Sequence, residues 1–265
     1  MELFKEFKNY VQKNILPDFT DNQAGLFEIY FNELIEWNKM FNLISFKSEK
    51  DLIYRHFCDS LYAAKAVKGT EELTTPERFD TQLKSGQFLR PLDRSLKVAD
   101  LGTGSGMPGI PVKIAMPQIK LTLVESIAKK CKFLENANKK LGFDIEILNK
   151  RAEEIGQDPA YRQKYDIVLS RAVSKFSPNL EIAIPLLKNN GYFIVHKTKN
   201  SAESPEEGLP SVENALRHLG ASFEKTVSYK LPEQELDYCV LVFKKYKDTP
   251  SQFPRNPGIP EKKPL

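Results

Sequence analysis

Residues 97–111 have the sequence KVADLGTGSGMPGIP, a short apolar strand, a glycine-rich turn and the start of a helix. Glycines at the alternate positions Gly102, Gly104 and Gly106 allow a tight turn with positive φ and a close approach of backbone to ligand. The following helix points its free amides and the positive end of its dipole at the turn, which favours a bound carboxylate or phosphate. The stretch therefore predicts a cofactor pocket in an α/β fold.

Two classes of cofactor suit this turn. The run from Gly104 to Gly109 satisfies the dinucleotide pattern G-x-G-x-x-G of NAD-dependent oxidoreductases. Asp100 at the strand end, followed directly by the alternating glycines, is more like the first motif of class I methyltransferases, which bind S-adenosylmethionine. The next strand ends in Glu125, where either class needs a carboxylate for the ribose hydroxyls. A purely structural turn is disfavoured because strand, turn, helix and second acid occur together.

Length and composition bound the class of protein. A chain of 265 residues, with 41% hydrophobic and 28% charged residues, fits one α/β domain with a helical extension. Three cysteines without metal-ligand spacing predict a reduced, cytoplasmic protein, and we expect no metal site. The charged N-terminus and the lack of a long apolar run predict neither a signal peptide nor a membrane span.

The excess positive charge is concentrated near the C-terminus. Residues 244–265 carry six basic and two acidic residues, which accounts for the whole net charge of +4. Such a tail is either an arm that lies along a phosphate backbone or a solvated end without a partner. We divide the chain into a helical extension (1–65), a mobile insertion without periodicity (66–96), an α/β core (97–245) and this basic, proline-rich tail (246–265).

The spacing of apolar residues predicts the elements around these segments. Helical spacing covers residues 2–16 and 21–40, and Ser48 begins a further helix to about Lys65. Strands are expected at 97–101, 121–125, 145–148, 166–169 and 192–196, with helices at 110–116 and 128–141, a helix ending at 189–191, a helix at 212–219 and a closing antiparallel pair at 222–231 and 238–243. The alternation of strand and helix predicts a parallel sheet whose ligands bind at the carboxyl ends of the strands. These ends carry Asp100, Glu125, Glu153, Arg171 and Lys197.

The helix after Ser48 carries two further polar candidates. His56 and Asp59 share a largely apolar face with Leu52, because they follow it at i+4 and i+7. They are either a catalytic pair or a hydrogen-bonded core histidine with its structural acceptor.

Six motifs together resemble the bacterial small-subunit rRNA guanine-N7 methyltransferases, the RsmG or GidB family. The motifs are Asn42-Leu43, His56-Phe57-Cys58-Asp59-Ser60-Leu61, Asp100 to Pro111, Lys129-Lys130-x-x-Phe133-Leu134, Arg151-Ala152-Glu153 and Ser170-Arg171-Ala172. The basic, proline-rich ending 253–265 is also similar to that of many members. The resemblance spans the chain except residues 66–96.

The resemblance implies a class I, Rossmann-like methyltransferase with an antiparallel last strand. The implied reaction is methylation of N7 of the guanine at position 527 of 16S rRNA, in naked rRNA or in the small ribosomal subunit, by a monomeric enzyme that uses S-adenosylmethionine. The cofactor-lining positions of the family fall on Gly102, Met107, Ala152, Glu153 and Arg171.

Guanine N7 has a free lone pair, so the reaction requires no proton removal, and the site should act by orientation and by excluding water. A carboxylate of Asp59 or Glu153 would stabilise the positive charge that passes to the base. Arg171 and Lys197 would hold a cofactor carboxylate or an RNA phosphate, and His56 would position the base or its helix. The alternatives are an NAD-dependent oxidoreductase and a non-catalytic rRNA-binding assembly factor.

Three positions depart from the family pattern. Glu125-Ser126-Ile127 replaces Asp-Ser-Leu and keeps the carboxylate. Met107 stands where an aromatic residue or leucine is frequent, and His196-Lys197-Thr198 replaces Leu-Lys-Gly, which puts a glycine-dependent backbone shape in question.

Overall fold

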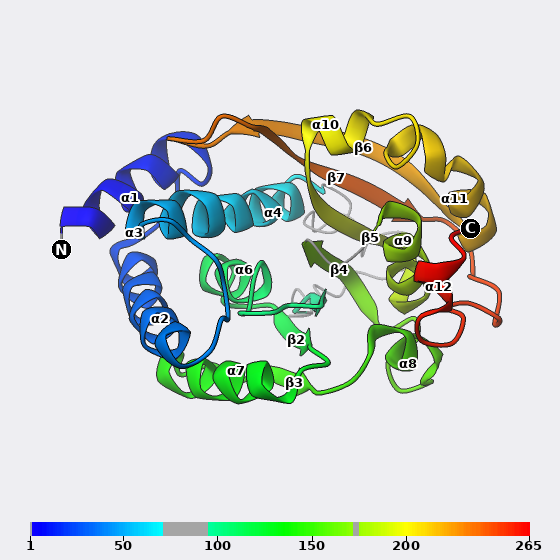
Figure 1. The fold of residues 1–265 in the computed structure, drawn as a ribbon, viewed down its shortest axis with the longest axis horizontal. Helices are drawn as coiled ribbons and strands as arrows, with labels where there is room; N and C mark the ends of the chain where they lie inside the picture. Colours follow the sequence, from blue (N-terminus) through cyan, green and yellow to red (C-terminus); the bar gives the residue numbers. More distant parts are fainter. Residues whose placement is uncertain (1, 71–94, 172–174) are drawn as a thin grey trace, which may run out of the picture.

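The computed structural model describes residues 2–70, 95–171 and 175–265 (Figure 1). Its centre is a seven-stranded sheet in the order β3-β2-β1-β4-β5-β7-β6. Strands β1 to β5 are parallel, and β7 runs antiparallel to both β5 and β6. The strands are β1 (Lys97–Leu101), β2 (Lys120–Val124), β3 (Glu146–Leu148), β4 (Tyr165–Arg171), β5 (Leu187–Thr198), β6 (Ala221–Lys230) and β7 (Asp237–Lys245).

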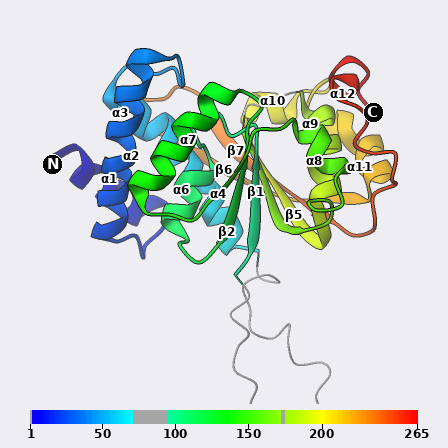
Figure 2. The same ribbon diagram turned by 90° about the horizontal axis from the view of Figure 1, so that it is seen from below.

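Helices cover both faces of the sheet, as Figure 2 shows. One face carries α1 (Glu2–Asn14), α2 (Asp21–Met40), α3 (Glu49–Asp51), η1 (Leu52–Cys58), α4 (Asp59–Lys68), α6 (Gly109–Ala115) and α7 (Ala128–Leu141). The other carries α8 (Ala152–Gln157), α9 (Phe176–Ala183), η3 (Ile184–Leu186), α10 (Lys199–Glu203), η4 (Leu209–Val212), α11 (Glu213–Leu219) and α12 (Ile259–Lys262). None of the helices in the described ranges combines the length and apolarity needed to cross a bilayer.

Successive side chains of each strand point alternately to the two faces of the sheet, and this produces two hydrophobic cores. Val98 of β1 belongs to the core beneath the N-terminal helices, and its neighbour Ala99 belongs to the core beneath α8, α9 and α11. Successive strand residues point to opposite faces, so strands covered on both sides are apolar throughout. In β1 and β2 only the first residue is exposed, and the other four are buried, as expected for strands covered on both faces.

The predicted N-terminal helices form and pack onto the sheet through α6. Thr20 caps α2 in a capping box with Gln23, whose Nε2 also donates to the Ile114 and Ala115 carbonyls of α6. Phe7 and Phe27, with ring centroids 5.0 Å apart, belong to the same core as the sheet residues. Residues 2–68 therefore cover one face of the sheet.

The helix that begins after Ser48 differs from the prediction in two ways. It continues to Lys68, and residues 52–58 are wound as the π-helix η1. The expected cap is present, because the Ser48 hydroxyl accepts from the Asp51 amide at 3.1 Å. The π turn departs from the regular i to i+4 hydrogen-bond pattern of an α-helix.

The predicted helix ending at Asn189–Gly191 is wrong. Helix α9 and the short η3 end at Leu186, and β5 begins at Leu187, which pairs with Tyr165 of β4. Asn190 has a φ of 65°, and the register shifts between Tyr165 and Ile167, so the Asn-Asn-Gly sequence forms an irregularity inside a long strand.

Of the predicted insertion, residues 71–94 lie outside the described residues.

Candidate functional site: the glycine loop and the end of strand β4

The loop after β1 turns at three glycines with positive φ, namely Gly102 (61°), Gly104 (61°) and Gly106 (94°). Glu125, which directly follows β2, fastens this loop, because its Oε2 accepts from the Gly104 amide at 3.0 Å. Its Oε1 accepts from the Ile127 amide at 2.8 Å. The carboxylate is therefore at the carboxyl end of β2, as predicted, and in contact with the glycine loop.

Asp100, at the end of β1, holds the loop by hydrogen bonds from inside the core. Its fully buried Oδ2 accepts from the Thr103 hydroxyl at 2.5 Å and from the Gly109 amide at 2.8 Å, so it ties both sides of the loop together. Burial raises the pKa of this carboxyl group to about 7. Its Oδ1 is buried without a hydrogen-bond partner in the described part of the chain. The Asp100 side chain thus shapes the pocket from within the core.

A cavity of about 320 Å³ opens at the carboxyl ends of β1, β2 and β3. It includes three of the predicted cofactor residues, Gly102, Ala152 and Glu153. Its other lining residues are Val124, Ser126, Lys150, Arg151, Pro178, Ile182, Gly258, Pro260 and Glu261. The predicted Met107 is buried in the loop, where it precedes a cis peptide bond to Pro108.

The cavity fits an adenosyl group in size and chemistry. A volume of this order suits a small ligand, and pockets of this kind combine apolar walls with a few polar groups. Val124, Pro178 and Ile182 supply the apolar surface, and the Glu153 carboxylate supplies an acceptor. A Cβ added at Gly104 would meet no atom closer than 3.9 Å, so the backbone of the loop is not packed tightly at this glycine.

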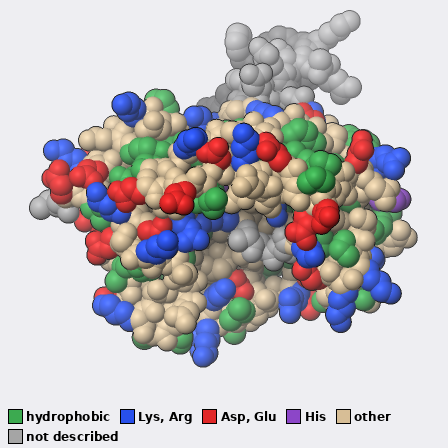
Figure 3. Space-filling view, turned by 45° about the horizontal axis from the view of Figure 1, so that its top comes forward, with side chains coloured by type: hydrophobic (Ala, Val, Ile, Leu, Met, Phe, Trp, Pro, Cys, Tyr) green, Lys and Arg blue, Asp and Glu red, His purple; other side chains and the backbone are tan. Residues whose placement is uncertain are grey.

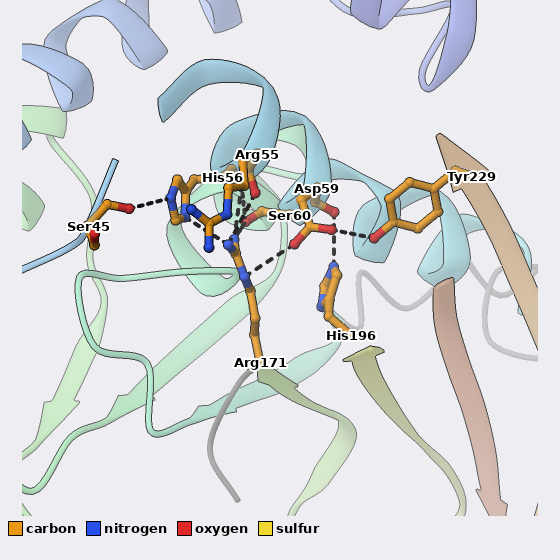
Figure 4. Close-up of polar contacts among 8 residues, drawn as sticks. All are labelled: Ser45, Arg55, His56, Asp59, Ser60, Arg171, His196 and Tyr229. Carbon is orange, nitrogen blue, oxygen red and sulfur yellow. Dashed lines mark hydrogen bonds and ion pairs between the residues drawn. The ribbon is translucent and has the colours of Figure 1, made fainter. Parts of the chain in front are cut away.

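Arg171, at the end of β4, occupies a second cluster, drawn in Figure 4. Its Nε lies 3.2 Å from Asp59 Oδ2. One terminal nitrogen donates to the His56 carbonyl and the Ser60 hydroxyl, and the other donates to the Arg55 carbonyl and to His56 Nδ1. All three guanidinium nitrogens therefore contact η1 and the start of α4.

His56 is a neutral acceptor in this cluster. Its Nε2 is 3.1 Å from the Ser45 carbonyl and donates to it, so Nδ1 accepts from Arg171 at 2.7 Å. Burial, followed by the neighbouring Arg171 charge, lowers the pKa of His56 to about 3. The imidazole therefore positions its neighbours and does not exchange protons near neutral pH.

Asp59 joins the cluster to β5 and β6. Its Oδ1 accepts from the Tyr229 hydroxyl of β6 at 2.5 Å, and its carbonyl accepts from His196 Nε2 of β5 at 2.9 Å. Tyr229 also stacks on Tyr62 of α4, with ring centroids 3.6 Å apart. Figure 4 shows Asp59 between Arg171 and Tyr229, with His196 beneath it. Tyr229 gave no sequence signal, because it is 170 residues from Asp59 in the chain.

Lys197 lies apart from this cluster. On β5 it follows His196, so its side chain points to the opposite face, where its Nζ is 5.2 Å from the Phe176 ring centroid. Burial lowers the pKa of this lysine. The structure thus brings His56, Asp59 and Arg171 together and separates Lys197 from them.

In the described ranges, no three His, Cys, Asp or Glu residues gather in a metal-binding group.

The departure at 196–198 has a structural explanation. Thr198 has ordinary extended dihedral angles, φ −77° and ψ 152°, and its hydroxyl caps α10 by accepting from the Ser201 amide. The backbone at this position does not require glycine.

The strand order, the antiparallel β7, the glycine loop after β1 and the carboxylates after β2 and β3 define a class I S-adenosylmethionine-dependent methyltransferase. A sequence model of the GidB family, described as rRNA small subunit methyltransferase G, matches residues 23–76 and 78–224. The chain belongs to this family. Membership confirms the predicted cofactor and enzyme class, an S-adenosylmethionine-dependent rRNA methyltransferase, over the NAD-dependent alternative.

Curated relatives agree with the family over nearly the whole chain. The "Ribosomal RNA small subunit methyltransferase G" of Listeria monocytogenes serovar 1/2a is 36% identical over 249 residues, which cover 94% of this chain and 93% of that protein. The protein of the same name from Alkaliphilus oremlandii is 37% identical over 250 residues, with the same coverage. That of Desulforamulus reducens is 38% identical and covers 94% of this chain and 92% of its own length.

Proposed function

We propose that this enzyme transfers a methyl group from S-adenosylmethionine to N7 of the guanine at position 527 of 16S rRNA. Family membership, together with a cavity that joins Gly102, Ala152 and Glu153 at the carboxyl ends of the strands, carries the proposal. The substrate is naked 16S rRNA or the small ribosomal subunit, and the enzyme acts as a monomer in the cytoplasm.

The bound cofactor supplies an electrophilic methyl group on a sulfonium. Ala152 and Gly102 leave room for the adenosyl group, and the Glu153 and Glu125 carboxylates accept its hydrogen-bond donors. Asp100 holds the loop between Thr103 and Gly109 in the shape that this binding requires. These residues bind and orient, which is the main source of rate enhancement when the nucleophile is already free of its proton.

The Arg171 cluster supports this chemistry indirectly. Arg171 is fully engaged with η1 and α4, and the His56 ring is neutral, so both fix the end of β4 next to the N-terminal helices. The buried Asp59 carboxylate is neutralised by Arg171, so Glu153, which lines the cavity, is the carboxylate that we assign to the positive charge on the methylated base. We assign Lys197, on the other face of β5, to the cofactor carboxylate or an RNA phosphate.

The test is transfer of labelled methyl from S-adenosylmethionine to small ribosomal subunits and to protein-free 16S rRNA, followed by mapping of the labelled base. We expect label on N7 of one guanine, and the better acceptor identifies the stage of assembly at which the enzyme acts. Cofactor binding without transfer to either acceptor would contradict the substrate assignment and favour a non-catalytic rRNA-binding factor.

A further inference from the structure

The C-terminal segment 253–262 is fixed on the enzyme core beside the cavity. Figure 1 shows α12 next to α8 and α9, the two helices that contribute the cavity residues Ala152, Glu153, Pro178 and Ile182. The segment adds three residues of its own to the lining, namely Gly258, Pro260 and Glu261. The sequence had offered only an arm along RNA or a solvated end for this part of the chain.

Two arginines fasten the segment. Arg255 pairs with the fully buried Glu181 of α9, with nitrogen–oxygen distances of 2.8 and 2.6 Å. Arg162 donates to the Phe253 carbonyl at 2.5 Å and to the Thr249 carbonyl at 2.8 Å. A buried carboxylate without its partner is strongly unfavourable, so these contacts hold the segment in one position.

One hydrogen bond joins the segment to a predicted cofactor residue. The Gly258 amide donates to Glu153 Oε1 at 3.1 Å. Gly258 has a φ of 80°, a conformation that other residues adopt at a cost, and it directly precedes α12. One carboxylate oxygen of Glu153 is therefore held by the C-terminal segment, which fixes the direction of the other.

We propose that residues 256–261 form one wall of the cofactor pocket, with Gly258 as a positioning residue for Glu153. The buried Pro260 adds an apolar surface to those of Pro178 and Ile182, and the Glu261 carboxylate adds a second acceptor. Apolar walls with carboxylate acceptors suit a purine that carries an amino group. This inference rests on the proposed use of S-adenosylmethionine, and it gives the basic tail a role in cofactor binding.

The test measures binding of S-adenosylhomocysteine by calorimetry, without RNA or turnover. Gly258→Val should weaken binding at least tenfold, because the side chain forces the backbone out of positive φ and moves the amide from Glu153. Gly142→Val is the matched control: Gly142 also has positive φ (66°), and at both positions an added Cβ meets no atom within 4 Å. This control should bind within twofold of the unchanged protein.

A double-variant cycle separates positioning from general damage. Glu153→Ala should weaken binding, and adding Gly258→Val to it should cost little more, because both changes disrupt the same contact. Equal affinities of the Gly258→Val and Gly142→Val proteins would overturn the inference.

Hydrogen exchange on the unchanged protein provides a second measurement that needs no variant. S-adenosylhomocysteine should slow amide exchange at 258–262 as well as in the glycine loop at 102–106. Slowing in the loop alone would overturn the inference and leave the proposed function intact. A failure of the unchanged protein to bind S-adenosylhomocysteine would instead contradict the proposed function, and this inference with it.

Discussion

Arg171 connects two segments that are distant in the chain. From the end of β4 its guanidinium contacts the Asp59 carboxylate and the backbone of η1, more than 110 residues earlier. Its side chain is 16% exposed and that of Asp59 is 5% exposed, so the pair is shielded from water. Loss of one partner from such a pair leaves the other as an uncompensated buried charge.

Arg171→Met should therefore lower the free energy of unfolding by about 3–5 kcal/mol. Urea denaturation measures this change. Lys39→Met is the control, because the Lys39–Glu36 pair on α2 is largely exposed, at 64% and 66%, and should contribute less than about 1 kcal/mol. Similar losses for the two variants would show that Arg171 does not link the helices to the sheet.

His56 should make stability depend on pH in acid. Burial and Arg171 hold its pKa at about 3 in the folded protein, whereas an unfolded histidine titrates near its ordinary value of 6.5. Between these values the unfolded state binds the extra proton, so the free energy of unfolding falls as the pH drops from 6.5 toward 3. Burial also lowers the pKa of His196, and this contribution has the same sign.

Replacing His56 by glutamine should reduce this slope by up to about 1.4 kcal/mol per pH unit, because the amide keeps a donor and an acceptor but does not titrate. Urea denaturation between pH 7 and 4 measures the slope. An unchanged slope in His56→Gln would contradict the neutral buried state.

At the scale of elements, the loop between β1 and α6 is held from several sides. Asp100 and Glu125 bind its amides, and the Tyr30 hydroxyl of α2 donates to the Ser105 carbonyl. At Gly106 an added Cβ would lie 2.5 Å from Ile110 Cδ1 and 2.8 Å from the Tyr30 hydroxyl. Gly106 is therefore required both by its φ of 94° and by close packing.

Gly106→Ala should lower the free energy of unfolding by about 1–3 kcal/mol and weaken S-adenosylhomocysteine binding, because the loop must shift. Gly25→Ala should have the opposite sign and stabilise the protein by up to about 1 kcal/mol, since Gly25 lies within α2 with open space at its Cβ. Thermal unfolding and calorimetry test both changes. A stabilised Gly106→Ala protein would contradict the close packing.

At the scale of the whole molecule, the methyl-transfer site determines where RNA must lie. Figure 3 shows a hollow on the side where the parallel strands end, with Lys and Arg side chains around parts of its rim. Lys129 and Lys130, at the start of α7, belong to this side, and the Lys130 ammonium is close to the glycine loop, 3.9 Å from the position of a Cβ on Gly104. Arg255 of the tail is already paired with Glu181.

Changing Lys129 and Lys130 together to glutamine should weaken rRNA binding and lower the salt slope by about 1.4 to 1.8, as expected for two lost phosphate contacts. Changing Lys120 and Lys164 to glutamine is the control of equal charge, because both lie at the opposite end of the strands. Binding measured from low to moderate salt distinguishes them. An equal loss in the two proteins would show that RNA responds only to net charge.

Residue spacing within single strands, turns and helices was enough to predict the α/β class, the glycine loop, the carboxylates at the strand ends and the family. The contacts between distant elements could not be predicted in this way. Arg171 meets the Arg55 carbonyl across 116 residues of chain, and Gly258 meets Glu153 across 105. The local sequence pattern predicts the position of a polar group within its own helix or strand. Its hydrogen-bond partner depends on how distant elements pack, so the contacts that fix the C-terminal segment can be seen only in the folded molecule.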